Sequence, residues 1–222
     1  MKEDNITVRY IVAFVISLIT FISGIFLGLA LAKKEVYLVG ISEHKIKSNL
    51  FELETTVRFL EKNICDKNLI KDFGLDLDKV GKELEKLENK IFVSKEEYRY
   101  LKNFYYALEI NHFMLLEKAK EMCNESYVFI LYFYRDIKEC KKCYEQSLYL
   151  TTLKEKFPEL VQIYSFDMRD YNKSILVKKL MLKYSIEPKE KGPVLIINGK
   201  KESFKTLHEL EKLVKLNNKQ DR

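Results

Sequence analysis

The sequence predicts a mixed α/β domain, preceded by a helical region and by one apolar N-terminal helix. Three observations predict this architecture. Residues 10–32 carry no charge, residues 36–122 repeat apolar side chains at helical spacing, and residues 123–217 alternate between strand and helix patterns. A chain of 222 residues has room for one or two domains besides such an apolar segment.

The composition is that of a folded protein with a solvated surface of mixed charge. Hydrophobic residues make up 47% of the chain and charged residues 32%, and the net charge is +6. The lysines are interspersed with glutamates along the predicted helices, which is typical of exposed helix faces and not of a nucleic-acid stripe. We therefore expect no nucleic-acid partner.

Residues 10–32 are long enough to cross a membrane. At 1.5 Å per residue this segment spans about 34 Å, and the hydrocarbon core of a bilayer is about 30 Å thick. A cleaved signal peptide is the alternative, because Ala30-Leu31-Ala32 resembles a cleavage site. Since the apolar part of a signal peptide has at most about 15 residues, the length favours an uncleaved signal anchor that follows a short tail, residues 1–9.

Charge counts do not decide the orientation of this segment. Lys2 and Arg9 precede it, and Lys33 and Lys34 follow it. A literal positive-inside count leans toward a cytoplasmic C-terminal side, but large domains cross the membrane largely regardless of such charges.

Small residues recur four apart in the same segment. They are Thr20, Gly24, Gly28 and Ala32. Such a stripe could pair two membrane helices into a homodimer, although small residues are common in membrane helices in general.

Residues 36–122 predict three amphipathic helices. The first apolar stripe comprises Ile46, Leu50, Leu53, Val57, Leu60 and Ile64. The second comprises Leu77, Val80, Leu84, Leu87 and Ile91, and the third Tyr98, Leu101, Tyr105, Leu108, His112, Leu115, Ala119 and Met122. A break before the second helix is marked by Asn63, Asp66, Asn68 and Gly74, and Asp76 is the expected N-cap of that helix. Ser94 and Glu97 form a capping box for the third helix. These helices predict an antiparallel bundle, or a hairpin whose last helix packs on the following domain.

The sequence leaves the role of this helical region open. It could present a surface to a partner or hold the following domain away from the membrane, or it could only complete the core. His112 lies on the third apolar stripe, where we expect a core histidine satisfied by its neighbours. A metal ligand is not expected there, because no second histidine or cysteine pair is placed to help it.

Residues 123–217 predict a domain with the order β-α-β-α-β-β-α. Its expected elements are a strand at 127–134, a helix that ends before Pro158, a strand at 161–166, a helix at 174–184, a strand at 194–197, a return strand at 200–204 and a last helix capped by Thr206. Asn198-Gly199 between the last two strands is a strong hairpin signal. We expect a disordered tail at 218–222.

A Cys-Lys-Lys-Cys sequence stands between the first strand and the first helix of this domain. Cys140 and Cys143 would then lie at the first turn of a helix, where free backbone N–H groups and the helix dipole favour a thiolate. The thiolate is the form that attacks a disulfide. Lys141 and Lys142 should lower the pKa of Cys140 further and make the disulfide more oxidising, an effect that Glu139 opposes.

This order of elements, with Cys-x-x-Cys opening the first helix and Pro193 opening the third strand, resembles the thioredoxin-like superfamily over residues 125–217. The resemblance implies that Cys140 is the exposed attacking thiol and Cys143 the buried resolving thiol. It also implies that Pro193 is a cis-proline next to the dithiol, where it leaves the backbone before it free to pair with a substrate. Gly192 would help to tune the thiols and orient the substrate.

Three positions depart from the thioredoxin pattern. Glu139 replaces a tryptophan, Lys141-Lys142 replaces Gly-Pro, and no acid stands near Tyr134, where thioredoxin has a buried one. These departures argue against a general cytoplasmic reductant.

The resemblance implies a membrane-anchored thiol–disulfide oxidoreductase of undetermined direction. It would exchange disulfides with client proteins, need no cofactor, and depend on a redox partner that resets the dithiol. We expect its domain on the extracytoplasmic side of the membrane. The alternative is a membrane-tethered adaptor that binds proteins without redox chemistry.

Cys65 and Cys123 are the other two cysteines. A structural zinc site would need them as a second ligand pair, but neither has a ligand neighbour at the required spacing, so we favour redox chemistry at Cys140 and Cys143. Outside the cytoplasm Cys65 and Cys123 could form a structural disulfide. Because the sequence does not show whether their Cα atoms come within about 7 Å of each other, we favour buried free thiols.

Overall fold

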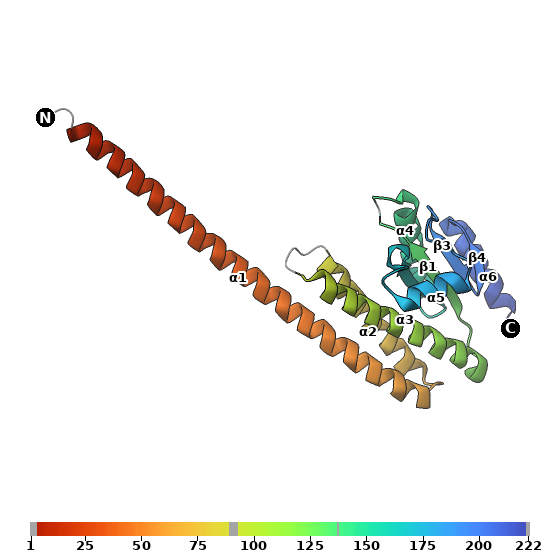
Figure 1. Ribbon diagram of the computed structural model, residues 1–222. Coiled ribbons are helices and arrows are strands. Elements are labelled where there is room, and N and C mark those ends of the chain that lie inside the picture. The colour runs from red at the N-terminus through yellow and green to blue at the C-terminus, as the bar shows by residue number, and fades with distance from the viewer. Residues whose placement is uncertain (1–3, 89–92, 137, 221–222) are drawn as a thin grey trace.

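The structure, a computed structural model, describes residues 4–88, 93–136 and 138–220 (Figure 1). The elements in these ranges are α1 (Asp4–Lys62), α2 (Lys67–Glu88), α3 (Lys95–Cys123), β1 (Val128–Tyr134), α4 (Lys141–Lys156), β2 (Val161–Asp167), the 3-10 helix η1 (Met168–Asp170), α5 (Ile175–Lys183), β3 (Val194–Ile197), β4 (Lys200–Glu202) and α6 (Leu207–Gln220). The predicted mixed α/β class with an apolar N-terminal helix is confirmed.

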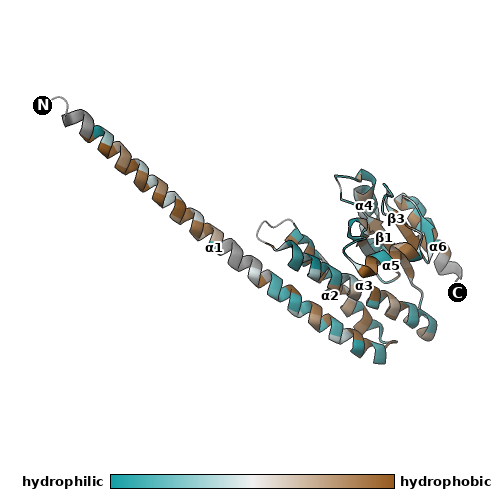
Figure 2. Cartoon of the chain, viewed as in Figure 1, coloured by the Kyte–Doolittle hydropathy of each residue, from teal (hydrophilic) through white to brown (hydrophobic). Residues whose placement is uncertain are grey.

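Helix α1 is 59 residues long and joins the apolar segment to the helical region without a break. Its stretch Val8–Lys33 is long and apolar enough to cross a membrane, and no other part of the molecule covers it. Figure 2 shows this stretch as the hydrophobic N-terminal half of α1, which projects away from the rest of the chain. The helix begins already at Asp4, within the predicted tail, and no proline interrupts it because the first proline of the chain is Pro158.

The C-terminal half of α1 forms an antiparallel three-helix arrangement with α2 and α3. The first predicted stripe is buried, from Ile46 to Ile64. Because α2 leads back along α1 and α3 returns in the direction of α1, the C-terminal ends of α1 and α3 lie at the same end of the bundle. Both predicted features are present, because the three helices form an antiparallel bundle and α3 also packs on β2 and α5.

Helix α2 begins at Lys67, nine residues before the predicted N-cap. Asp66 caps it, since its Oδ1 accepts hydrogen bonds from the backbone N–H groups of Asn68 at 3.0 Å and Leu69 at 3.2 Å. The predictions that Gly74 breaks the helix and that Asp76 caps it are therefore wrong, because both lie inside α2.

The glycines of α2 allow a close approach to α3. A Cβ atom at Gly81 would lie 2.5 Å from Oη of Tyr105, and one at Gly74 would lie 3.3 Å from Cε1 of His112. A glycine in mid-helix lowers helix stability by about 1 kcal/mol relative to alanine. Here the glycines permit the close packing of α2 against α3. The expected end of the second stripe, Ile91, lies outside the described residues.

Helix α3 has the predicted N-cap. The Oγ of Ser94 accepts a hydrogen bond from the backbone N–H of Glu97 at 3.5 Å. The helix ends at Cys123, where Asn124 adopts the left-handed conformation with φ 54°. Met122, the last predicted member of the stripe, is 62% exposed, so that assignment is wrong. At the end of α3, Cys123 is the residue that packs against the core.

The sheet has the strand order β2-β1-β3-β4. β1 pairs in parallel with β2, and the β1–β3 and β3–β4 pairs are antiparallel. The predicted hairpin is confirmed, since Asn198 and Gly199 both have positive φ, 46° and 81°, as a tight turn between β3 and β4 requires. The element order predicted for this domain is present, with η1 in the expected loop and α5 directly after its cap Ser174.

Helices cover both faces of the sheet. Alternating residues of β1 separate the two cores: Phe129, Leu131 and Phe133 face α3 and α5, while Val128, Ile130 and Tyr132 face α4 and α6. The first core is continuous with the interior of the helical region, from Ile46 to Ile196. The helical region therefore completes the core of the α/β part. Helix α6 continues to Gln220, past the expected domain end at residue 217.

Candidate functional site: the Cys140–Cys143 disulfide

The two cysteines of the Cys-Lys-Lys-Cys sequence form a disulfide where β1 leads into α4. Their Cα atoms are 5.2 Å apart. Cys140 is the N-cap of α4, and its Sγ accepts a hydrogen bond from the backbone N–H of Cys143 at 3.0 Å. The loop before it is closed by the carbonyl of Asp136, which accepts from the N–H groups of Glu139 and Cys140, each at 2.9 Å. The predicted position at a helix N-terminus is therefore present.

Both sulfurs are buried in this disulfide form. Cys140 is 4% exposed and Cys143 is 2% exposed. The expectation that Cys140 is exposed is wrong here, because an N-cap side chain turns back onto the first turn of its helix. Cys143 is buried as expected, and the hydroxyl of Tyr132 donates to its carbonyl at 2.5 Å.

The charged neighbours of the disulfide point into solvent. Lys141, Lys142 and Glu139 are exposed. Nη1 of Arg135 lies 3.0 Å from the Glu139 carboxylate and pairs with it, and Nζ of Lys142 lies 5.8 Å from the ring centroid of Phe204. With Glu139 already paired, the two lysines are left as the excess charge beside the sulfurs. Their effect on the pKa of Cys140 stays a prediction.

Arg135 fastens the dithiol loop to the segment that precedes β3. Its Nε donates to the carbonyl of Glu190 at 3.0 Å, and its guanidinium also contacts the carbonyl of Pro188. These contacts connect Arg135, and through it Glu139, to the segment that contains Pro188 and Glu190.

Pro193 lies at the same edge of the sheet, but its peptide bond is trans. The pairing of Phe133 with Val194 places Pro193 next to the point where the dithiol loop leaves β1. No cis peptide bond occurs in the described ranges, so the expected cis-proline is wrong. The trans form of an X-Pro bond is favoured by about 0.5–1 kcal/mol, and a cis bond needs tertiary contacts that repay this. Gly192 is half-buried with open space where a Cβ would lie, and its tuning role stays a prediction.

An acid does lie next to Tyr134, supplied by the neighbouring strand. The parallel pairing of β1 with β2 sets Asp167 beside Tyr134. Asp167 is 1% exposed, and burial alone would raise its pKa, but the hydrogen bonds from Arg169 and the charge of Lys102 lower that pKa below the usual value. The signal in the sequence is an aspartate at the end of a buried strand, and only the pairing of strands shows what it faces.

Asp167 belongs to a buried network that joins α3 to the dithiol loop. Nζ of Lys102 lies 3.2 Å from Oδ2 of Asp167 and 3.0 Å from Oδ2 of Asp170. Tyr106 donates to Asp170 at 3.0 Å. Arg169 binds Asp167 and also donates to Oδ2 of Asp136 at 2.9 Å, in the loop that ends at Cys140.

Cys65 and Cys123 form a second disulfide, with Cα atoms 5.5 Å apart. The expectation of free thiols is wrong, because the return through α2 brings the C-terminal ends of α1 and α3 together. Cys65 is exposed and Cys123 is half-buried. The two cysteines that a zinc site would need are thus bonded to each other, away from Cys140 and Cys143.

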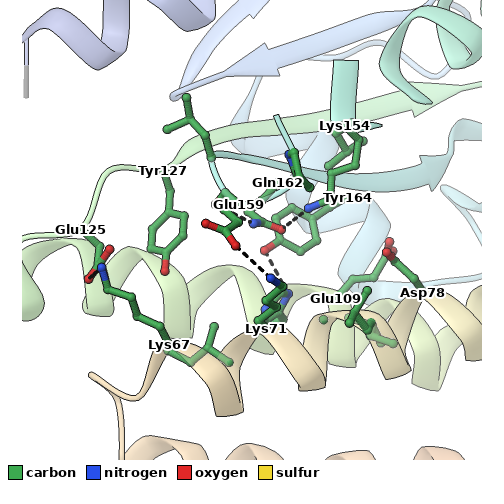
Figure 3. A pocket seen from close by; sticks show the side chains of 18 of the residues that line it. Lys67, Lys71, Asp78, Glu109, Glu125, Tyr127, Lys154, Glu159, Gln162 and Tyr164 are labelled. Carbon is green, nitrogen blue, oxygen red and sulfur yellow. Dashed lines mark hydrogen bonds and ion pairs between the residues drawn. The ribbon is translucent and has the colours of Figure 1, made fainter. Parts of the chain in front are cut away.

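A cavity of about 850 Å³ lies between α2, α3 and β2 (Figure 3). Ion pairs between Lys71 and Glu159 at 2.8 Å and between Lys67 and Glu125 at 2.7 Å stand at its rim. Its other labelled lining residues are Asp78, Glu109, Tyr127, Lys154, Gln162 and Tyr164. No cysteine lines it, so it is separate from the dithiol.

His112 lines this cavity, and only one of its two ring nitrogens has a hydrogen-bond partner among the described residues. Its Nδ1 lies 3.2 Å from the hydroxyl of Tyr164, and its Nε2 has no hydrogen-bond partner among the described residues. Burial, and secondly the charge of Lys154, lowers the pKa of His112 to about 3, so the ring is neutral. Burial also raises the pKa of Glu109, whose Oε1 accepts from the N–H of Ser165 at 3.2 Å.

No protein-family model, curated protein or solved structure matches this chain. The site is therefore characterised by its own geometry, namely a disulfide at the N-terminus of a helix that directly follows the central strand of a mixed sheet.

Proposed function

We propose that this protein is a membrane-anchored, thioredoxin-like thiol–disulfide oxidoreductase that exchanges disulfides with client proteins through Cys140 and Cys143. The observation that carries the proposal is the position of their disulfide at the start of α4, directly after β1. The strand order β2-β1-β3-β4, with one parallel and two antiparallel pairs, supports a thioredoxin-like arrangement. So does the placement of α4 and α6 on one face and α5 on the other.

The exchange proceeds in two steps that balance electrons and atoms. The Cys140 thiolate attacks one sulfur of a client disulfide, forms a mixed disulfide and expels the other client sulfur as a thiolate. The Cys143 thiolate then attacks Sγ of Cys140 and expels the second client thiolate. Two electrons pass from the dithiol to the client, and the client thiolates take up the two protons that the dithiol released. The reverse sequence oxidises a client dithiol, and in either direction a partner dithiol or disulfide resets the pair.

The residues around the sulfurs favour this chemistry at Cys140. The backbone N–H of Cys143 already donates to Sγ of Cys140, and the same donor stabilises a thiolate at that atom. The sulfur is covered in the disulfide form, so a client must displace part of its cover before it can react.

Two features support an anchored protein on the oxidising side of a membrane. Helix α1 runs through Ala30-Leu31-Ala32 without a break, which supports an anchor that is not cleaved there. A pair of disulfides, one of them in an exposed position, is typical of proteins outside the reducing cytoplasm.

The second candidate is a membrane-tethered adaptor in which the Cys140–Cys143 disulfide only closes the start of α4. The burial of both sulfurs favours this candidate. In an adaptor the pair would stay closed, and replacing Cys140 would leave client binding intact.

The test is the reduction potential of the Cys140–Cys143 pair in the full-length protein in detergent. The protein is equilibrated in glutathione buffers, and the trapped thiols are located by mass spectrometry. A value between about −120 and −180 mV indicates an oxidant or isomerase, and a value near about −270 mV indicates a reductase.

The variant Cys140→Ser should lose all exchange with a disulfide-containing peptide. The matched control, Cys65→Ser with Cys123→Ser, should keep it under conditions in which circular dichroism shows this variant to be folded. If glutathione never opens or closes the Cys140–Cys143 pair, or if Cys140→Ser keeps full exchange, the oxidoreductase proposal is wrong and the adaptor takes its place.

A further inference from the structure

We infer that the dithiol acts on cysteines of other membrane-anchored proteins, in segments close to the membrane surface. This inference rests on the proposed function and names its class of client. It comes from the position of the Cys140–Cys143 disulfide, which lies at the end of the folded body that is nearest to the apolar half of α1.

The helical region has one end near the apolar stretch and one end away from it. The apolar stretch of α1 ends at Lys33. About three to four turns later, two ion pairs join α1 to the body. Lys45 pairs with Glu83 of α2 at 2.6 Å, and Lys47 pairs with Glu97 at the start of α3. The C-terminal part of α2 and the first turn of α3 therefore lie at the near end (Figure 1). The Cys65–Cys123 disulfide lies at the far end.

The dithiol loop is bound to the near end through one arginine. Nη2 of Arg169 lies 3.8 Å from Oε1 of Glu88, the last residue of α2, and Nη1 donates to Asp136 at 2.9 Å. The carbonyl of Asp136 in turn accepts from the N–H of Cys140 at 2.9 Å. A chain of direct contacts thus links Cys140 to the end of α2.

The length of α1 sets the height of this end. From Lys33 to Lys47 the helix rises about 21 Å, and to its end at Lys62 about 43 Å. With Lys33 at the edge of the hydrocarbon core, the near end stands about 20 Å from that edge. The headgroup layer occupies roughly the first 6 Å of this distance.

A continuous helix holds this height, whereas a flexible linker would average over many heights. Helix α1 has no break between the apolar stretch and the bundle, and the contacts of Arg169 tie the dithiol loop to the near end. Cysteines in a short segment next to a membrane helix are then within reach. Cysteines that stand far above the surface would have to approach past the body of the protein.

The experiment uses the full-length chain as Cys143→Ser, in which the mixed disulfide on Cys140 cannot be resolved. It is reconstituted into liposomes with anchored probes. Each probe is a transmembrane peptide with one cysteine activated as a mixed disulfide, about 20 Å or about 60 Å from the membrane on a proline-rich spacer that extends about 3.1 Å per residue. A soluble peptide with the same activated cysteine is the third probe.

We expect the near probe to be trapped at least tenfold faster than the far one. A helical insertion of 18 residues after Lys33 keeps the face of α1, since 18 residues make five turns, and raises the body by about 27 Å. It should lower trapping of the near probe and raise that of the far probe. A glycine-serine insertion of the same length is the matched control, and it should remove the preference altogether.

The outcomes separate this inference from the proposed function. If the near and far probes are trapped at equal rates, or if the helical insertion changes nothing, the inference is wrong while disulfide exchange stands. If no probe is trapped, including the soluble one, the proposed function itself fails.

Discussion

The two disulfides of this protein differ in nearly every respect. Cys65–Cys123 joins the ends of two helices across a sequence separation of 58, and Cys65 is exposed. Cys140–Cys143 spans a separation of 3 within the first turn of α4, and both of its sulfurs are buried. The first lies at the end of the helical region that is far from the apolar half of α1, and the second is tied through Arg169 to the near end.

Under the proposed function, this difference separates a structural disulfide from an exchangeable one by loop length more than by burial. In the chain-entropy model, closing a loop of 58 residues stabilises a fold by about 4 kcal/mol, and closing one of 3 residues by about 1.5 kcal/mol. The fold depends heavily on the first bond. We expect it to tolerate opening of the second, as the proposed disulfide exchange requires.

The largest expected effect comes from removing the long-range disulfide. Cys65→Ser with Cys123→Ser should lower the free energy of unfolding by about 4 kcal/mol, while Cys140→Ser with Cys143→Ser should lower it by about 1.5 kcal/mol. Guanidinium unfolding of both variants, followed by circular dichroism, measures the two values. Equal losses would refute the assignment of one structural and one exchangeable disulfide.

A smaller effect is expected from the buried network between α3 and the dithiol loop. Lys102→Met removes the cation that faces Asp167 and Asp170, and an uncompensated buried charge costs about 3 kcal/mol. Hydrogen exchange should also rise around Asp136, and protection at the Cys65–Cys123 end should stay unchanged. Lys71→Met, which removes an exposed ion pair, is the matched control and should have no measurable effect. Equal losses from both variants would count against the network.

The pH dependence of stability tests the cavity between the two disulfides. His112 has a lowered pKa of about 3 in the folded chain and about 6.5 when unfolded, so between these values only the unfolded chain takes up the proton. Stability is then lost as the pH falls below about 6.5, by about 2 kcal/mol between pH 7 and pH 5.

His112→Gln should remove that share of the loss. Urea unfolding of both proteins at pH 7, 6 and 5 measures it. Glu109, whose pKa burial raises, is present in both proteins, so the difference between them reports on His112. Parallel pH curves for the two proteins would show that His112 is not held neutral.

The smallest effect concerns the two lysines between the cysteines. Lys141→Gln with Lys142→Gln should make the pair more reducing, because exposed charges that stabilise the thiolate are lost. An exposed charge interaction is worth about 0.5 kcal/mol, which corresponds to a shift of about 10 mV. Lys178→Gln with Lys179→Gln on α5 is the matched control and should leave the potential unchanged. A shift toward a more oxidising potential would contradict the expected direction.

Much of the local structure can be predicted from side chains that are close together in the chain. The order of strands and helices, the caps at Ser94 and Thr206 and the Asn198-Gly199 turn all follow from side chains a few residues apart. The same holds for the position of Cys140 and Cys143 at a helix start. Such features depend on periodicity, capping and turn chemistry, which a short stretch of sequence contains.

What these local elements face cannot be predicted from such patterns. The pairing of Cys65 with Cys123, the acid beside Tyr134 and the trans bond at Pro193 depend on contacts between segments far apart in the chain. The burial of Cys140 likewise depends on how α4 and its loop pack. The directions of α1, α2 and α3 together decide at which end of the body the dithiol lies. The direction in which a helix runs through the body is set by its packing and not by its own sequence.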